Sequence, residues 1–270
     1  MRTIETPTEL RAALAPKRQT SRIGLVPTMG AFHEGHLSLM RAARGECDVV
    51  VASVFVNPTQ FGPAEDLAAY PLDSERDARL AAEVGVDLVF APSAEEMYPE
   101  GFRTWVEVEE LGRRLEGEQR PGHFRGVATV CLKLFNIVRP DRAYFGQKDA
   151  QQAALVEQLV RDLDLEVEIR VLPTVRDPDG LALSSRNAYL SQDERQKALV
   201  LPRALSAGKE AYENGADPDS AARAVLLADL DIGVDYVEAV RLNGRLVLAA
   251  AVRIGRTRLI DNVVLEGAFE

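Results

Sequence analysis

The sequence contains no long apolar run and few cysteines. Its longest apolar stretch, residues 49–56, is interrupted by Ser53 and falls well short of the roughly 18 residues that a membrane-spanning helix needs. The first residues carry charge and lack the apolar core of a secretion signal. Cys47 and Cys131 are the only cysteines, too few for a disulfide framework. We therefore expect a cytoplasmic protein, in a reducing compartment and without a membrane partner.

Basic residues are outnumbered by acidic ones. The chain has 32 Lys and Arg against 42 Asp and Glu, which gives a formal net charge of −10. Broad nucleic-acid binding needs a basic face, so we expect no nucleic-acid partner. A small anionic ligand is still compatible with this charge, because a few cations that converge locally are sufficient to bind it. The sequence shows no low-complexity tract and no repeat of fixed period.

The first two thirds of the chain alternate between strand and helix patterns. Apolar runs typical of buried parallel strands are separated by stretches with the apolar spacing of helices. The expected strands of this kind are residues 22–26, 48–56, 87–90 and 142–145. Residues 165–172 alternate apolar with charged residues, which predicts a strand with one exposed face. The expected helices are residues 35–43, 73–85 and 125–138, and one more that follows residue 149. This alternation predicts an α/β fold, an open parallel sheet with helices on both faces.

The pattern changes near Pro173. Ser191-Gln-Asp-Glu194 matches a capping box, from which we expect one long helix that ends near Asn214-Gly215. Asp217-Pro218 supplies an N-cap and a first-turn proline for another helix. Short strands are expected at about residues 236–240, 246–254 and 258–264. We therefore divide the chain into a larger domain, 1–174, and a smaller C-terminal α+β domain, 175–270.

Two histidines follow the first expected strand, in the segment His33-Glu-Gly-His36. They stand at the start of a helix, whose N-terminus presents N–H groups and a partial positive charge that favour phosphate. Imidazoles at this place can donate hydrogen bonds to phosphate and stabilise charge that develops during group transfer. A zinc-protease helix of the H-E-x-x-H type is excluded, because Leu37 stands where the second histidine would be. A pair of histidines that only packs a turn is the open alternative.

Two further segments offer groups for a polyphosphate. Gly146-Gln-Lys-Asp149 ends a strand and opens a helix. Its glycine allows close approach, its lysine supplies charge, and its aspartate can cap the helix or bind a ribose. Leu183-Ser-Ser-Arg186 combines two hydroxyls with a guanidinium. Taken alone, each segment favours a structural interpretation: a helix cap with a solvated lysine in the first, a polar loop in the second.

Amide side chains at Asn57 and Gln60 follow the second expected strand. Because ligands of open α/β sheets bind at the carboxyl ends of the strands, we expect these amides near the histidines. They suit a small hydroxylated carboxylic acid. A simple Asn-Pro turn without a ligand is the alternative.

Together these segments resemble the pantoate–β-alanine ligases, also called pantothenate synthetases. The matching stretches stand in the family's order: Val26-Pro-Thr-Met-Gly-Ala-Phe-His-Glu-Gly-His36, Val54-Phe-Val-Asn-Pro-Thr-Gln-Phe61, Gly122-His-Phe-Arg-Gly-Val127, Tyr144-Phe-Gly-Gln-Lys-Asp-Ala-Gln-Gln152 and Leu183-Ser-Ser-Arg-Asn187. The resemblance implies a Rossmann-like first domain and ATP-dependent condensation of (R)-pantoate with β-alanine through a pantoyl adenylate, with AMP and pyrophosphate released. It also implies Mg²⁺ with the nucleotide, no metal site of the protein's own, and a homodimer.

The resemblance also implies roles for individual residues. The catalytic groups would be His33, His36, Lys148 and Arg186. ATP would contact Met29, Gly30, Ala31, Phe32, His33, Glu34, Gly35, His36, Gly146, Gln147, Lys148, Asp149, Val175, Leu183, Ser184, Ser185 and Arg186. Pantoate and then β-alanine would contact Gln60, Gln152 and Asn57. Because the adenylate is labile to water, we also expect the segment 122–127 and the smaller domain to cover it, the smaller domain as a lid.

Two other functions compete with this one. A nucleotidyltransferase that moves AMP or CMP onto a phosphorylated acceptor would share His33 and His36. It would need cations in its acceptor pocket, where Asn57 and Gln60 are neutral. A non-catalytic nucleotide-binding module would need the fold and some phosphate contacts, but not all four cationic groups. Pyrophosphate release that depends on pantoate distinguishes these functions.

Overall fold

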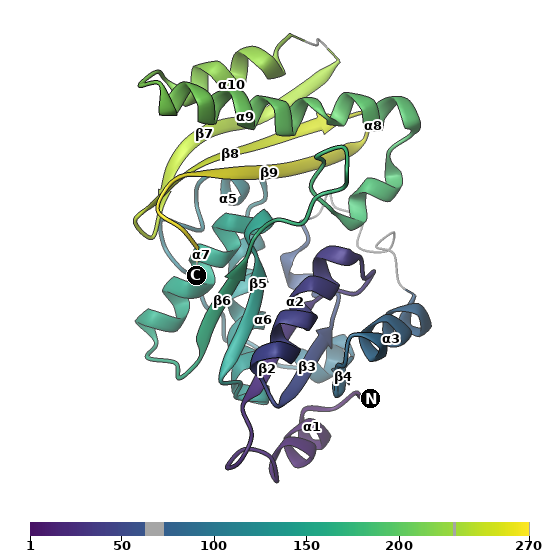
Figure 1. The fold of residues 1–270 in the computed structure, drawn as a ribbon. Helices are drawn as coiled ribbons and strands as arrows, with labels where there is room; N and C mark the ends of the chain where they lie inside the picture. The colour runs from purple at the N-terminus through teal and green to yellow at the C-terminus, as the bar shows by residue number, and fades with distance from the viewer. Residues whose placement is uncertain (63–72, 229–230, 270) are drawn as a thin grey trace. The chain divides into compact units, whose positions relative to one another are not determined.

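The computed structural model describes residues 1–62, 73–228 and 231–269, and it divides into two compact units (Figure 1). The first unit comprises Met1–Phe145 and Gln151–Leu172, and the second comprises Gly146–Ala150 and Pro173–Glu270. No helix in these described ranges is long and apolar enough to cross a membrane.

The first unit is built on a six-stranded sheet with the order β1-β4-β3-β2-β5-β6. Its strands are β1 (Arg2–Ile4), β2 (Ile23–Thr28), β3 (Val49–Val54), β4 (Leu88–Phe90), β5 (Arg142–Gly146) and β6 (Glu168–Leu172). The pairs β1–β4, β4–β3, β3–β2 and β2–β5 are parallel. The chain runs from β2 outward to β3 and β4, then returns to β5 on the other side of β2, so the strand order reverses between β2 and β5. Open α/β sheets bind ligands at such a reversal, outside the carboxyl ends of the strands.

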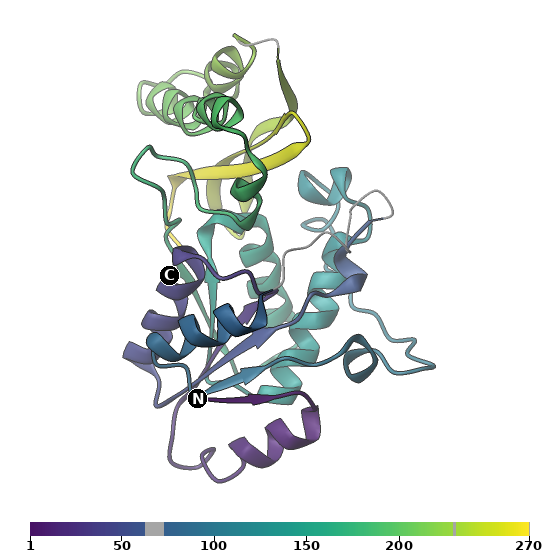
Figure 2. The ribbon, with the colours of Figure 1, turned by 90° about the vertical axis from the view of Figure 1, so that its right-hand side faces the viewer.

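Helices cover both faces of this sheet (Figure 2). One face carries α2 (Glu34–Glu46) and α3 (Ser74–Glu83), and the other carries α1 (Pro7–Leu14) and α6 (His123–Val138). The remaining helical elements of this part of the chain are α4 (Ala94–Met97), α5 (Glu116–Gln119), α7 (Ala150–Asp162) and the 3₁₀ turn η1 (Pro58–Gln60). The 3₁₀ turn η2 (Gln147–Asp149) belongs to the second unit. β2 and β3 are buried along most of their length because helices lie on both sides, which explains their near-continuous apolar sequence.

The second unit contains an antiparallel sheet with the order β7-β8-β9. Its elements are η3 (Ser185–Tyr189), α8 (Gln192–Ala198), α9 (Val200–Glu213), α10 (Pro218–Leu226), β7 (Ile232–Leu242), β8 (Arg245–Ile254) and β9 (Thr257–Glu266). Asn243 and Gly244 both have positive φ, the conformation that a two-residue hairpin turn requires between β7 and β8. Leu205 of α9 and Leu226 of α10 pack with Leu248 of β8 in one apolar core.

The observed architecture confirms the expected α/β sheet followed by a smaller α+β part. The capping box is also confirmed. Ser191 Oγ accepts from the backbone amide of Glu194 at 3.2 Å, and the Glu194 carboxylate accepts from the backbone amide of Ser191 at 2.9 Å. The expectation of one long helix after it is wrong, because the helix is interrupted at Leu199. Pro202 lies in the first turn of α9. Its ring would clash with the carbonyl of Ala198 in a continuous helix, so α8 stops there and α9 starts anew.

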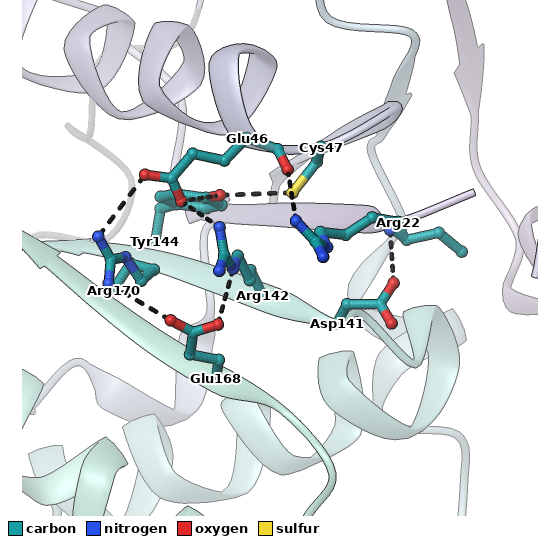
Figure 3. A network of polar contacts seen from close by, with 9 residues as sticks. Arg22, Glu46, Cys47, Asp141, Arg142, Tyr144, Glu168 and Arg170 are labelled. Carbon is teal, nitrogen blue, oxygen red and sulfur yellow. Dashed lines mark hydrogen bonds and ion pairs between the residues drawn. The ribbon is translucent and has the colours of Figure 1, made fainter.

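A network of charged side chains joins α2 to the starts of β5 and β6 (Figure 3). Arg142 bridges Glu46 at 2.8 Å and Glu168 at 2.7 Å, and Arg170 approaches both carboxylates. Tyr144 donates to Glu46 at 2.9 Å, and burial raises the pKa of this tyrosine so that its hydroxyl keeps its proton. The network lies at the strand starts, away from the carboxyl ends where ligands bind. We therefore assign it a structural role.

Candidate active site

Two imidazoles lie side by side at the start of α2. After β2 the backbone turns through Gly30 and Ala31, both at positive φ (86° and 52°). His33 is the N-cap of α2, and its Nδ1 accepts a hydrogen bond from the Gly35 amide at 3.1 Å. The ring centroids of His33 and His36 are 4.2 Å apart. Both rings therefore occupy the end of the helix where its dipole favours an anion.

A pair of residues from α3 clamps the turn that precedes these histidines. Asp77 is 1% exposed, and its carboxylate accepts from the amides of Ala31 at 2.7 Å and Phe32 at 2.8 Å. Arg76 donates to the Phe32 carbonyl at 3.0 Å. We name this arrangement the Arg76–Asp77 clamp. Sequence reasoning missed it, because nothing in the sequence indicates that an acid in a first helical turn is buried against a distant loop.

The amide residues that follow β3 form a hydrogen-bonded pair. Asn57 is 1% exposed, and its Nδ2 donates to Gln60 Oε1 at 3.1 Å and to the Gly126 carbonyl at 3.2 Å. Its Oδ1 accepts from the Tyr98 hydroxyl at 2.9 Å, and burial raises the pKa of that tyrosine, which keeps it a donor at neutral pH. Gln60 Nε2 lies 3.1 Å from Met29 Sδ, close to the turn after β2. The Gln60 amide is thus held with its oxygen toward Asn57.

The start of α6 and the residue Arg120 before it support the same pair. His123 Nδ1 lies 2.9 Å from the Gln60 carbonyl, and Arg120 lies 3.1 Å from the other ring nitrogen. A side chain at Gly126 would come within 2.5 Å of the Thr59 carbonyl, so only glycine allows this close packing of α6 on η1. The segment 122–127, which carries part of the family resemblance, therefore shapes the surroundings of Gln60.

In the second unit, Lys148 lies in the 3₁₀ turn η2. Its Nζ approaches the Asp149 carboxylate at 3.6 Å, and its side chain is 18% exposed. Asn262 of β9 donates to the carbonyls of Gln147 at 2.8 Å and Lys148 at 2.9 Å. The short turn is therefore tied to the C-terminal sheet within this unit.

The other expected nucleotide segment of the second unit is a bridged loop. The Leu183 amide donates to the Val175 carbonyl at 3.0 Å, which places these two residues together. Ser184 caps η3 by accepting from the Arg186 amide at 3.3 Å. The backbone is thus ordered by local contacts, as the structural interpretation of a polar loop requires, and its contact with a nucleotide stays a prediction.

The expected site residues are divided between the two units. The group in the first unit is Met29, Gly30, Ala31, Phe32, His33, Glu34, Gly35, His36, Asn57 and Gln60, with Gln152 on α7. The group in the second unit is Gly146, Gln147, Lys148, Asp149, Val175, Leu183, Ser184, Ser185 and Arg186. His33 and His36 thus belong to one unit and Lys148 and Arg186 to the other, so their convergence on one triphosphate stays a prediction. Among the described residues, no three His, Cys, Asp or Glu side chains form a group that could hold a metal ion.

Comparison with known sequences agrees with the resemblance of the motifs. A family model described as pantoate–β-alanine ligase matches residues 2–264. The chain is 54% identical over 271 residues to the pantothenate synthetase of Pelotomaculum thermopropionicum, which covers 95% of this chain and 96% of that protein. It is 54% identical over 280 residues to the pantothenate synthetase of Moorella thermoacetica, with 98% and 99% covered.

Solved structures are similar along the same length. The crystal structure of pantothenate synthetase from Thermus thermophilus has a TM-score of 0.94 and 50% identity, and covers 99% of this chain and 100% of that one. Pantoate–β-alanine ligase from Francisella tularensis, solved in complex with β-γ ATP and β-alanine, has a TM-score of 0.84 and 37% identity, with 99% of both chains covered. The chain therefore belongs to the pantoate–β-alanine ligase family, and it is an ATP-dependent ligase that joins pantoate to β-alanine.

Proposed function

We propose that the ligation proceeds through a pantoyl adenylate, with His33, His36, Lys148 and Arg186 as the groups that stabilise its formation. The pantoate carboxylate attacks the α-phosphate of ATP, and the bond to the leaving pyrophosphate breaks. The amine of β-alanine then attacks the acyl carbon and expels AMP. The observation that carries this proposal is the pair of imidazoles 4.2 Å apart at the N-terminus of α2, directly after the central strand β2.

The histidines act in this proposal as hydrogen-bond donors to phosphate. His33 accepts on Nδ1 from the Gly35 amide, which places the proton of the neutral ring on Nε2. A carboxylate that attacks a polyphosphate brings two anions together. Donors and cations fixed in advance reduce that repulsion and stabilise the charge on departing pyrophosphate. His36 acts on that charge as a hydrogen-bond donor, and no proton needs to reach the leaving group.

Nucleotide contacts are proposed for residues 29–36, 146–149, Val175 and 183–186. Lys148 would bind phosphate, and Asp149 would accept from the ribose. Magnesium would enter as part of the substrate, MgATP. Mg²⁺ bound to a nucleotide keeps much of its shell as water and phosphate oxygens, so it needs few ligands from the protein.

Pantoate is assigned to Gln60 and Gln152, and β-alanine later to Gln60. Asn57 holds the Gln60 oxygen, so the Gln60 N–H groups are the part of the amide suited to donate to a carboxylate or hydroxyl. Asn57 has protein partners on both its oxygen and its nitrogen. Its contribution to substrate binding would therefore be made largely through Gln60.

The proposal also covers the enzyme's location in the cell, its oligomeric state and the role of its smaller domain. A cytoplasmic location is supported by Cys47 and Cys131, which are both buried free thiols. A homodimer is proposed from the family resemblance. A lid role for residues 175–270 is proposed because the adenylate must be kept from water.

Stepwise supply of the substrates tests this proposal. ATP, magnesium and pantoate are mixed first, and pyrophosphate is followed in a single turnover. β-Alanine is then added and AMP is followed. The proposal requires pyrophosphate before β-alanine is present and AMP only after it. If pyrophosphate appears only when pantoate and β-alanine are both present, formation of the adenylate as a separate first step is excluded.

A further inference from the structure

The C-terminal strand β9 carries an amide whose hydrogen bonds are directed at the Lys148 turn. Asn262 is 3% exposed. Its Nδ2 donates to two successive carbonyls, those of Gln147 and Lys148, at 2.8 and 2.9 Å. Its Oδ1 lies 3.4 Å from Nε2 of Gln147, which donates to it. Both donors and the acceptor of one side chain thus contact η2, and all of these residues belong to the second unit.

The preceding residue on β9 holds the other expected nucleotide segment. Asp261 is 2% exposed, and Arg176 contacts both of its oxygens, at 2.6 and 3.0 Å. Arg176 stands next to Val175 and forms a β-bridge with Ala182, at the base of the loop that leads to Arg186. Asp261 also accepts from the backbone N–H of Asn262 at 2.8 Å, so its carboxylate is held by its own strand as well as by Arg176.

We propose that Asp261 and Asn262 are positioning residues for adenylate formation. They set the Lys148 turn and the 175–186 loop at a fixed separation, so that the side chains of Lys148 and Arg186 are in place before ATP binds. The inference rests on the proposed roles of Lys148 and Arg186. It gives the C-terminal sheet a function besides covering the site, because the segments that would hold the phosphates are anchored on one of its strands.

The reason for such an anchor is the flexibility of the groups that it serves. Lysine is a point charge on a four-carbon stem, so its placement depends on how firmly its backbone is held. η2 is a single 3₁₀ turn, and the 175–186 loop is mostly irregular. β9 is ten residues long and pairs with β8 along most of its length. Sites held by rigid elements keep their geometry better than sites on loops alone.

Asn262→Ala is the informative variant, because it removes the three contacts to η2 without leaving a buried charge. Val263→Ala is the matched control, since Val263 is the next residue of β9 and packs on the apolar core of the second unit. The first step is measured as pyrophosphate release in a single turnover. The second step is measured by adding β-alanine to supplied pantoyl adenylate. Rates are expressed per folded molecule, with the folded fraction taken from circular dichroism.

We expect Asn262→Ala to slow the first step by on the order of 100-fold, the size of loss that a misplacement of about 1 Å can cause. The second step, in which pyrophosphate has already left, should change little. Asn262→Ser keeps one donor and should fall between. Val263→Ala should leave both steps near the unaltered rates. Equal losses in both steps, or the same loss in Val263→Ala, would overturn the inference.

A double-variant cycle with Lys148→Ala shows whether Asn262 acts through the lysine. If it does, the double variant is no slower than Lys148→Ala alone, because the anchored group is already missing. If the loss of rate in the double variant equals the product of the losses in the two single variants, Asn262 acts elsewhere and the inference is overturned. A large loss for Lys148→Ala with none for Asn262→Ala overturns this inference alone. An unchanged first step in Lys148→Ala overturns the proposed role of the lysine and the inference together.

Discussion

Replacement of Asp77 by asparagine tests whether the Arg76–Asp77 clamp sets the position of the two histidines. The aspartate offers one oxygen to the Ala31 amide and the other to the Phe32 amide. Asparagine has nearly the same shape but only one acceptor. One of the two amides, buried at Phe32 and partly buried at Ala31, must therefore lose its partner, which costs about 1–3 kcal/mol of folding free energy.

The effect on activity can be worked out from the backbone that the clamp holds. Ala31 has a φ of 52°, in the left-handed region, and an L-residue other than glycine costs about 1–2 kcal/mol there. If the weakened clamp no longer offsets this cost, the turn relaxes and His33 moves with it. The fraction of molecules that hold His33 in its proper position then falls by roughly 5- to 30-fold, which is the cost of about 1–2 kcal/mol expressed as a ratio of populations. We expect the first step to slow by that factor.

Pyrophosphate release in a single turnover measures this loss, and urea unfolding measures stability beside it. The matched control is Asp73→Ala on the same helix, where Asp73 caps α3 by accepting from the Arg76 amide at 3.0 Å. Loss of such a cap costs about 1 kcal/mol of stability but leaves the turn at Ala31 intact. The control should therefore unfold more easily and still form adenylate at the normal rate.

A second substitution separates strain at the turn from general damage. Ala31→Gly in the Asp77→Asn background removes the cost of the left-handed conformation, so part of the lost rate should return. The reasoning is refuted if Asp77→Asn is less stable but forms adenylate at the unaltered rate. It is equally refuted if the glycine restores nothing.

Three further substitutions have defined outcomes. His36→Ala should slow adenylate formation by about 100- to 1,000-fold, the usual loss of one strong transition-state donor, and an unchanged single-turnover rate would remove His36 from this role. Gln60→Ala should weaken the use of pantoate more than the binding of ATP, and equal losses in binding titrations would contradict the assignment. Tyr144→Phe should lower the free energy of unfolding by about 1–2 kcal/mol through its lost hydrogen bond to Glu46, whereas any change in the rate of either half-reaction would argue against a structural role for the network.

Local sequence determined most of the secondary structure. The expected strand at 22–26 corresponds to β2 and the one at 48–56 to β3, because a continuous apolar run is stable only between two layers of helices. Asp217 caps α10 by accepting from the Ser220 amide at 3.0 Å, as its sequence predicted. Caps and apolar periods act within a few residues, so they can be recognised in the sequence.

Elements that depend on distant partners were not predicted. The three-residue strand β1 is too short to show a period, and its pairing with β4 makes it a strand. The helix expected from residue 191 onward is interrupted because Pro202 fits the first turn of a helix but not its interior, so a new helix begins at Val200. The sequence shows the proline, but the direction that the chain takes after it depends on packing against the C-terminal sheet.

The sequence by itself determined the chemistry of the site: two histidines at a helix start, a lysine after β5, an arginine in a polar loop and amides after β3. It also determined the family, through five motifs in order. Only the tertiary structure decided what holds these groups in place. Asp77 lies 45 residues from Phe32, and Asn262 lies 115 residues from Gln147, whose backbone atoms they bind. Such contacts have no local pattern, because a buried hydrogen bond depends on proximity in space.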